Sequence, residues 1–254
     1  MAAPSERRAL ITGGAGGVGA AVARGLARTG YHVVITDLDP DACAALAAEI
    51  AQDGGSAEGA ALNVTDRAAV DALFSEQDAK GSIDTLVTSA AIVKPAPILD
   101  FDPDDWARIL DVNLTGTFHC CQAAGRRMVQ AGFGRIITIS SVNGQIANSY
   151  RGAYSCTKGG VDMLTRLLAA ELGANGVTAN AVAPTPVDTP MILQVHGAQD
   201  RKRWTDQIPA ARYAQPEEVA AAVAFLASEE AAYVNGHILN LDGGFMASGI
   251  LLDR

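Results

Sequence analysis

A glycine-rich turn follows the first apolar run of this 254-residue chain and limits the folds that the chain can adopt. The run Ala9–Thr12 has the composition of a buried strand and leads directly into Gly13-Gly14-Ala15-Gly16-Gly17-Val18-Gly19. A helical pattern over Val18–Thr29 comes next. Glycine lets the backbone turn tightly and approach a ligand, and the free N–H groups at a helix N-terminus attract anions. This order of strand, turn and helix predicts a site for the pyrophosphate of a dinucleotide.

Two glycine frames fit the turn, Gly14-x-Gly16-x-x-Gly19 and Gly13-x-x-x-Gly17-x-Gly19. Asp37 ends the next predicted strand at about the 20-residue spacing where a carboxylate accepts hydrogen bonds from an adenosine ribose. The same negative charge would repel a 2′-phosphate, and no Arg or Lys lies in Gly13–Gly19 or directly after Asp37. The sequence therefore predicts NAD rather than NADP as the cofactor.

Short β-rich runs alternate with helical stretches along the chain, which predicts a parallel sheet wrapped by helices. Apolar residues are nearly continuous in these runs, as in Ile136-Ile137-Thr138-Ile139, and this is typical of strands covered on both faces. We predict an α/β fold, a doubly wound Rossmann-type parallel sheet of about seven strands flanked by helices. The predicted strands are Ala9–Thr12, Tyr31–Asp37, Ala57–Asn63, Ile83–Thr88, Arg135–Ser140, Val177–Val182 and His237–Leu241. The predicted helices are Val18–Thr29, Asp41–Gln52, Arg67–Ala79, Pro103–Ala131, Ala153–Ala174 and Pro216–Ser228, and Thr65 or Asp66 and Asp102 are expected to cap two of them.

No linker, internal repeat or low-complexity segment interrupts this alternation. We therefore predict that residues 1–254 form a single NAD-binding and catalytic domain. The segment 184–213 has no clear helical or strand periodicity and is expected to be a mobile lid over the substrate.

Composition excludes several classes of function. A net charge of −9 and a pI near 4.8 argue against binding to nucleic acids or anionic membranes, because such surfaces select basic proteins. No apolar run approaches the roughly 18 residues of a membrane span, and no secretory signal is visible, so a cytoplasmic protein is expected. Four cysteines without a Cys-x-x-Cys motif are interpreted as core fillers in a reducing compartment, and four scattered histidines do not support a metal site.

Tyr154 and Lys158 are four residues apart in a predicted helix, so both side chains point to the same side. A phenol titrates near pH 10, and a fixed ammonium group nearby stabilises the phenolate and lowers its pKa. Such a pair can act as an acid and base at neutral pH. Ser141 lies thirteen positions upstream of Tyr154. The spacing alone also fits an exposed helix face, where a tyrosine packs on a lysine stem.

Taken in order, these motifs resemble those of the short-chain dehydrogenases/reductases, from roughly Arg8 to Phe245. Thr12-Gly13-x-x-x-Gly17-x-Gly19 matches the glycine pattern of that family and selects the second frame above. The other matching motifs are Asn63-Val64, Asn113 in Val112-Asn113-Leu114, Ile139-Ser140-Ser141-x-x-Gly144, and Asn235-Gly236 with Asp242-Gly243-Gly244. The last of these belong to a segment that often forms part of a tetramer interface in the family, so a homotetramer is expected.

The resemblance implies a role for each catalytic position. Tyr154 would exchange a proton with the substrate oxygen, and Lys158 would lower the Tyr154 pKa and hold the nicotinamide ribose. Ser141 would donate a hydrogen bond to the carbonyl or alkoxide, and Asn113 would hold a water that links Lys158 to solvent.

The resemblance also implies which residues surround the cofactor and the substrate. The expected cofactor-binding residues are Gly13, Ala15, Gly17, Val18, Gly19, Asp37, Leu38, Asn63, Val64, Ala90, Tyr154, Lys158, Pro184, Val187 and Thr189. The expected substrate-binding residues are Lys94, Ser141, Asn143, Tyr154 and Thr185. Further residues expected to line or approach the pocket are Val93, Val142, Gln145, Asn148 and Arg151, with His196 or Trp204 on the lid.

Two segments depart from the family pattern. Thr88-Ser89-Ala90-Ala91 replaces the usual Asn-Asn-Ala-Gly, and Ala91 adds a Cβ where the backbone normally passes close to the cofactor. Thr185 stands where glycine usually follows the first proline of Pro184-Thr185-Pro186, and it cannot readily adopt positive φ. The second change is expected to reshape the entrance for the substrate.

We therefore expect an oxidoreductase that transfers a hydride between NAD(H) and a secondary alcohol or ketone, with a small polar substrate such as a sugar, polyol or hydroxy acid. One alternative is an NADPH-dependent 3-oxoacyl-thioester reductase. Another, of a different class, is a dinucleotide-binding or sensing protein without catalytic activity.

Overall fold

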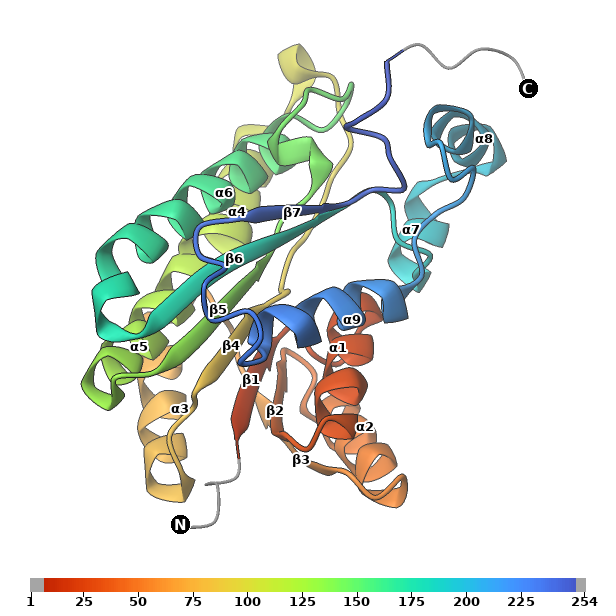
Figure 1. Cartoon of the computed structure of the whole chain (residues 1–254). Helices are drawn as coiled ribbons and strands as arrows, with labels where there is room; N and C mark the ends of the chain where they lie inside the picture. Colours follow the sequence, from red (N-terminus) through yellow and green to blue (C-terminus); the bar gives the residue numbers. More distant parts are fainter. Residues whose placement is uncertain (1–6, 250–254) are drawn as a thin grey trace.

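The computed structural model describes residues 7–249, and a single sheet of seven parallel strands forms its centre (Figure 1). The strands are β1 (Arg8–Thr12), β2 (His32–Asp37), β3 (Ser56–Ala61), β4 (Thr85–Thr88), β5 (Gly134–Ile139), β6 (Val177–Pro184) and β7 (Ile238–Leu241). Their order across the sheet is β3-β2-β1-β4-β5-β6-β7. The chain thus starts in the middle and winds outward in both directions, which confirms the predicted doubly wound fold.

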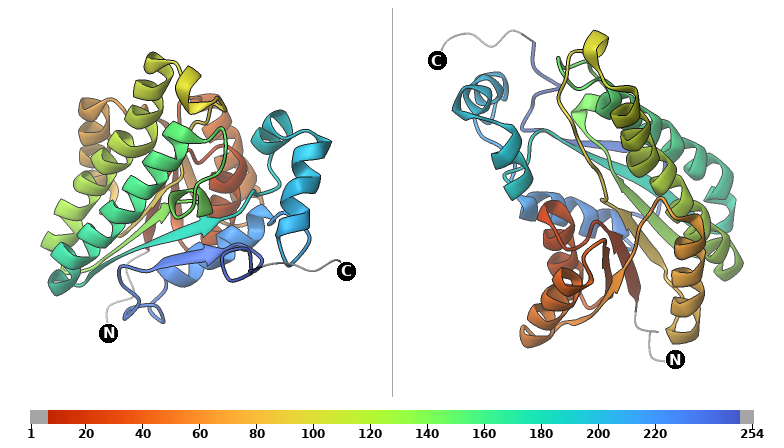
Figure 2. Two further views of the ribbon diagram at one scale, coloured as in Figure 1. Left: turned by 90° about the horizontal axis from the view of Figure 1, so that it is seen from above. Right: turned by 180° about the vertical axis from the view of Figure 1, so that it is seen from behind.

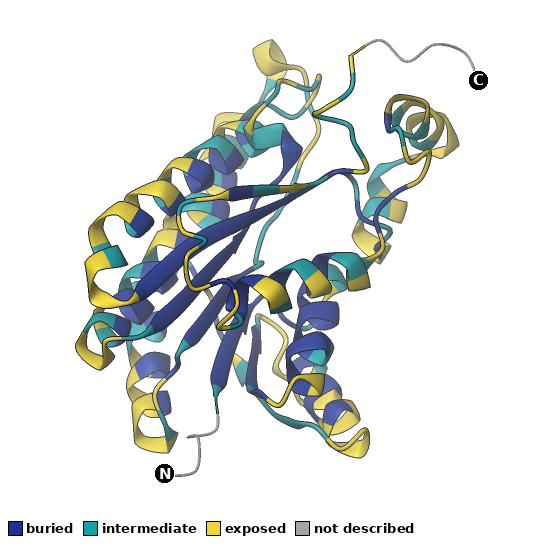
Figure 3. Cartoon of the chain, viewed as in Figure 1, coloured by how far each residue is buried: buried dark blue, intermediate teal, exposed yellow. Residues whose placement is uncertain are grey.

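Helices cover both faces of the sheet (Figure 2). They are α1 (Gly17–Arg28), α2 (Pro40–Gln52), α3 (Arg67–Lys80), α4 (Pro103–Leu110), α5 (Gly116–Ala131), α6 (Gly152–Leu172), α7 (Pro190–Val195), α8 (Ala198–Gln207) and α9 (Pro216–Ala227). Neighbouring strand residues point to opposite faces, so Ile11 packs with α1, α2 and α9 while Leu10 packs with α3, α5 and α6. The central strands are buried between two apolar layers, whereas the edge strands β3 and β7 and the outer helix faces are partly exposed (Figure 3).

Aspartate side chains begin three of these helices. Asp39, Asp66 and Asp102 each accept hydrogen bonds from backbone N–H groups in the first turn of α2, α3 and α4. Such caps satisfy donors that have no partner within the helix. Of the two residues predicted to cap α3, the structure selects Asp66, whose Oδ1 accepts from Ala69 N at 3.0 Å.

The predicted helix Pro103–Ala131 is not continuous. A π-helical segment over Asp111–Thr115 separates α4 from α5. Asn113 lies in it, fully buried, and its Oδ1 accepts from Ile92 N at 2.8 Å while its Nδ2 donates to Ile92 O at 2.9 Å. The widened turn therefore directs a polar side chain at the loop after β4, and this tertiary contact accounts for the break.

The segment 184–213 contains two helices, contrary to the expectation of an aperiodic segment. Thr189 caps α7 and Pro190 occupies its first turn, a common helix start. Neither α7 nor α8 has a fully buried residue, so neither carries the apolar stripe by which helices are predicted. These helices stand apart from the main body beside α9 (Figure 1).

The cysteines correct a second expectation. Cys43, Cys120 and Cys121 are buried free thiols, as predicted for core residues, but Cys156 is exposed. Within residues 7–249, no helix is long and apolar enough to cross a membrane, and no three His, Cys, Asp or Glu residues are grouped as metal ligands.

Candidate active site

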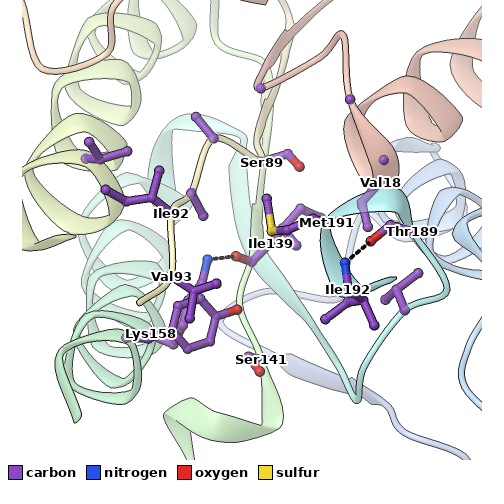
Figure 4. A pocket seen from close by; sticks show the side chains of 18 of the residues that line it. Val18, Ser89, Ile92, Val93, Ile139, Ser141, Lys158, Thr189, Met191 and Ile192 are labelled. Carbon is purple, nitrogen blue, oxygen red and sulfur yellow. Dashed lines mark hydrogen bonds between the residues drawn. The ribbon is translucent and has the colours of Figure 1, made fainter. Parts of the chain in front are cut away.

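A cavity of about 510 Å³ opens at the carboxyl ends of the parallel strands (Figure 4). Its walls come from the glycine turn after β1, the ends of β2, β4, β5 and β6, and the helices α6 and α7. Ligands of doubly wound sheets bind at this edge because the strand order reverses there and the loops diverge. The fold therefore places the glycine turn, Asp37 and Tyr154 around one cavity.

The glycine turn is packed too closely for side chains at Gly13, Gly14 and Gly19. A Cβ on Gly19 would lie 2.1 Å from Gly13 O, and a Cβ on Gly13 would lie 2.7 Å from Ala90 Cα. Gly13 also has a φ of +62°, which favours glycine. By contrast, a Cβ on Gly16 would meet no protein atom within 4 Å. The turn thus presents bare backbone to the cavity, which fits the pyrophosphate of a dinucleotide.

Asp37 lies at the end of β2 and faces this turn. Its Oδ2 accepts from Ala15 N at 3.3 Å and its Oδ1 accepts from Leu38 N at 2.8 Å. The cavity lining nearby consists of Leu38, which is exposed, and the run Leu62–Val64, and none of these residues carries a positive charge. Asp37 is therefore the charged group at this end of the cavity, where the family binds the adenosine half of a nicotinamide dinucleotide.

Ser141, Tyr154 and Lys158 line the opposite end of the cavity. Lys158 is buried, its Nζ donates to Ile139 O at 2.7 Å, and this atom lies 5.5 Å from the centre of the Tyr154 ring (Figure 4). Ser141 Oγ accepts from Asn143 N at 3.2 Å and donates to Pro184 O at 3.5 Å. A serine hydroxyl, a phenol and an ammonium group therefore share one wall.

Known proteins are similar to this chain over nearly its whole length. A family model described as enoyl-(acyl carrier protein) reductase matches residues 13–246. The D-threitol dehydrogenase of Mycolicibacterium smegmatis is 41% identical over 241 residues, which cover 93% of this chain and 92% of that protein. The 3-oxoacyl-[acyl-carrier-protein] reductase of a Synechocystis species is 39% identical over 249 residues, 97% of this chain and 99% of the other. The chain belongs to the short-chain dehydrogenase/reductase family.

A solved structure extends the likeness to three dimensions. The gluconate 5-dehydrogenase from Burkholderia cenocepacia, in complex with NADP and tartrate, matches with a TM-score of 0.92 and 38% identity over 96% of each chain. Short-chain dehydrogenases/reductases use a nicotinamide dinucleotide, and the relatives found act on alcohols or the corresponding ketones. The protein is therefore an oxidoreductase that acts on secondary alcohols.

Burial dominates the protonation of the Tyr154–Lys158 pair in this short-chain dehydrogenase/reductase. It raises the pKa of Tyr154, an effect that a hydrogen bond from Ser141 and the charge of Arg151 partly offset. It lowers the pKa of Lys158 to about 8, against a weaker opposing effect of Asp162. In the protein without cofactor the net shift of the Tyr154 pKa is upward, because desolvation outweighs the hydrogen bond from Ser141 and the charge of Arg151.

The buried ammonium of Lys158 predicts a pH-dependent stability. The unfolded chain holds this proton up to about pH 10.5 and the folded chain only to about pH 8, so between these values the stability of the wild type rises with pH. In Lys158→Met this contribution is absent. We expect the stability of the wild type relative to the variant to rise by about 3 kcal/mol across that window. Urea unfolding of both proteins without cofactor measures it, and parallel stability curves would contradict the expectation.

Most residues predicted for the site line the cavity. They are Gly13, Gly17, Val18, Asp37, Leu38, Asn63, Val64, Ala90, Ser141, Asn143, Tyr154, Lys158, Pro184, Thr185, Val187 and Thr189. Thr185 reaches this position without positive φ, since Tyr150 and Ala211 are the only non-glycine residues in 7–249 with that conformation.

Four predicted site residues do not line the cavity. Ala15 donates its backbone N–H to Asp37, and Gly19 packs against the backbone of Gly13. Buried Asn113 is bonded to the backbone of Ile92, a residue that lines the cavity. Lys94 is exposed, and its charge is paired with Asp105 on α4.

The further residues that were expected to line or approach the pocket also fall into two groups. Val93, Arg151, His196 and Trp204 line the cavity, whereas Val142, Gln145 and Asn148 do not. Sequence reasoning missed Arg108 on α4 and the α7 residues Met191, Ile192 and Val195. The pair Thr189-Pro190 was the available signal for α7, because a capping threonine before proline is a common helix start.

Proposed function

We propose that the protein is an NAD-dependent dehydrogenase of a small polar secondary alcohol, a sugar, polyol or hydroxy acid, that also works as a reductase in reverse. One observation carries this proposal: a single cavity holds Ser141, Tyr154 and Lys158 at one end and the glycine turn with Asp37 at the other. A substrate carbon beside Tyr154 and a nicotinamide held along the same cavity would then meet, as orientation of two reactants requires.

The bound dinucleotide supplies the carbon centre that accepts or donates the hydride. In our proposal Tyr154 takes the proton from the substrate hydroxyl, and Ser141 donates a hydrogen bond to the same oxygen. Lys158 holds the nicotinamide ribose and stabilises the phenolate. These roles place the acid–base group and the polar stabilising group on one wall of the cavity, away from bulk water.

Asn113 has contacts that suggest a role beside the expected water relay. Its side-chain amide is already bonded to the backbone of Ile92 and, through Nδ2 at 3.3 Å, to Thr157 Oγ1. Thr157 lies within the helix turn that carries Tyr154 and Lys158. We propose that Asn113 acts as a positioning residue, which joins this turn to the loop after β4.

The cofactor preference is proposed from the charge around the ribose end. Asp37 would accept hydrogen bonds from the ribose hydroxyls, and its charge disfavours a 2′-phosphate. Leu38 and Asn63 would flank the adenosine, while Pro184, Val187 and Thr189 would border the nicotinamide, with Thr189 bonded to its carboxamide. The related gluconate 5-dehydrogenase was solved with NADP, so the preference needs a direct test.

Replacing Asp37 by Ser is expected to weaken NAD binding by about 10- to 100-fold, because hydrogen bonds to a charged acceptor contribute about 1.5–3 kcal/mol. NADP binding is expected to tighten as the repulsion disappears. Quenching of tryptophan fluorescence measures both dissociation constants. Asp41→Ser, an exposed carboxylate in the first turn of α2, is the matched control and should change neither. Tighter binding of NADP than NAD by the wild type would overturn the proposed preference.

A 3-oxoacyl-thioester reductase remains the second candidate, since a relative carries that name at 39% identity. The polar and charged residues Ser141, Asn143, Arg151 and His196 in the cavity lining favour a small polar substrate over a long acyl chain. A panel of sugars, polyols, hydroxy acids and simple secondary alcohols with NAD, read by the absorbance of NADH, tests the proposal. Turnover of only 3-oxoacyl thioesters with NADPH would replace it.

The segment 184–213 is proposed as the substrate lid of a single domain formed by the whole chain. Its helices α7 and α8 contribute Met191, Ile192, Val195 and Trp204 to the cavity, although neither helix has a buried residue. Few buried contacts are typical of elements that open and close over a ligand.

We further propose a cytoplasmic homotetramer. Large apolar side chains, Phe118 on α5 and Met163 and Leu167 on α6, are 41%, 54% and 51% exposed, as expected of helix faces that meet other subunits. Light scattering during size-exclusion chromatography would determine the number of subunits. The buried thiols of Cys43, Cys120 and Cys121 are compatible with a reducing compartment.

A further inference from the structure

Arg151 is a charged group in the cavity without a charged partner. It directly precedes α6, three residues before Tyr154, and lines the cavity. Within residues 7–249, no carboxylate forms an ion pair with Arg151, and its Nη1 is buried without a hydrogen-bond partner. Burial also lowers the pKa of the guanidinium. A buried donor without a partner is unfavourable. Arg151 Nη1 is therefore satisfied only when a hydrogen-bond acceptor lies in the cavity beside it.

A second set of contacts holds the other side of the guanidinium in place. Arg151 Nη2 lies 2.6 Å from His196 Nε2, and His196 Nδ1 lies 2.9 Å from Tyr213 Oη. Since arginine can only donate, Nε2 must accept and the neutral imidazole must carry its proton on Nδ1. His196 also stacks on Trp204, with ring centres 6.4 Å apart. Arg151 is therefore oriented by a neutral chain of aromatic residues. Asp200 acts on its charge through space without an ion pair, so no carboxylate is bonded to the guanidinium.

The charges around the cavity have opposite signs at its two ends. Among the described residues that line it, Asp37 is the only carboxylate, and it lies at the ribose end. The catalytic end contains Lys158 and Arg151, and Arg108 on α4 is a third cation of the lining. Lys158 Nζ is already bonded to Ile139 O. An anionic substrate would meet an attractive field and an unused donor on Arg151, whereas a neutral polyol would leave the charge of Arg151 unpaired.

We propose that Arg151 binds a carboxylate of the substrate, so that the preferred substrates are small polyhydroxy acids rather than neutral polyols. This inference rests on the proposed function and narrows its substrate class. A planar guanidinium matches a carboxylate through parallel N–H···O bonds, which also orients the substrate. Because Arg151 lies one helical turn before Tyr154, the oxidised hydroxyl lies within a few carbons of the carboxylate.

The test compares threonate with threitol, which differ by a carboxylate in place of one hydroxymethyl group. We expect the wild type to have at least about tenfold higher kcat/KM for threonate, and Arg151→Gln to lower that value by about 100-fold. Loss of the Arg151 charge also raises the Tyr154 pKa, so turnover of threitol falls to a smaller extent. The decisive quantity is thus the ratio of kcat/KM for threonate to kcat/KM for threitol. Arg151→Lys should partly restore this ratio.

A charge-matched control separates binding from a general effect of charge. Arg203 is exposed on α8 outside the cavity lining, and Arg203→Gln should leave the ratio unchanged. Calorimetric titration of threonate into the enzyme–NADH complex gives a readout independent of turnover. Threonate binding that occurs in the wild type and is lost in Arg151→Gln would support the proposal. If at the same time no alcohol in the panel is oxidised, only the proposed function would be refuted. An equal loss for both substrates, a wild-type preference for threitol, or no threonate binding would overturn the proposal.

Discussion

Replacing Tyr154 by Phe is expected to lower kcat by about 10³-fold and leave the dissociation constant of NAD unchanged. The variant removes one oxygen atom and keeps the ring that packs beside Lys158. Without the phenol, the substrate hydroxyl has no positioned group to take its proton, because the neutral hydroxyl of Ser141 is too weak a base and Lys158 Nζ is bonded to Ile139 O. The loss therefore falls on the chemical step.

Steady-state rates measure the effect of Tyr154→Phe on kcat, and fluorescence titration with NADH measures its effect on dinucleotide binding. Tyr150→Phe is the matched control, because Tyr150 is 60% exposed and precedes Tyr154 by four residues. It should retain the kcat of the wild type. Since burial raises the pKa of Tyr154 in the free enzyme, the kcat/KM for alcohol oxidation should rise with pH through neutrality, and Tyr154→Phe should lose this dependence. Undiminished turnover by Tyr154→Phe would refute its proposed role.

The second large effect is expected for Gly19→Ala, which should abolish measurable dinucleotide binding and lower stability by about 1–3 kcal/mol. The added Cβ would lie 2.1 Å from Gly13 O and 2.9 Å from Gly14 Cα, far inside van der Waals contact. Both clashes involve backbone atoms, so the turn itself must move. A displaced turn no longer presents its N–H groups to the pyrophosphate.

Gly16→Ala provides the matched control for this variant. The change in volume is the same, but the new Cβ meets no protein atom within 4 Å, and Gly16 has a negative φ of −121°. We expect its midpoint of thermal unfolding to equal that of the wild type. Equal stability of Gly19→Ala and Gly16→Ala would contradict the packing explanation for the glycine turn.

The sheet was predictable because its strands carry strong local signals. Apolar runs such as Ile136–Ile139 read as buried strands, and all seven predicted strands occur within a few residues of their expected bounds. The glycine turn was equally predictable, since a close backbone approach admits only glycine, and Asp37 ends its strand as predicted. These features depend on residues near one another in the chain.

Features that depend on distant partners were not predictable. The π-helical turn at Asn113 exists because its amide bonds to Ile92, which is 21 residues away. The helices α7 and α8 lack buried residues, so they carry no apolar period from which to predict them. Lys94 was expected at the substrate, but its charge is paired with Asp105 on α4.

By itself the sequence determined the fold class and the dinucleotide turn, which follow from local backbone geometry, and the Tyr154–Lys158 pair, which follows from spacing along one helix. Only the tertiary structure decided the protonation of that pair and the position of Arg151. Burial sets the pKa values of Tyr154 and Lys158, and burial is a property of the packed molecule. The environment of Arg151 likewise depends on His196 and Tyr213, which are brought to it from 45 or more residues away.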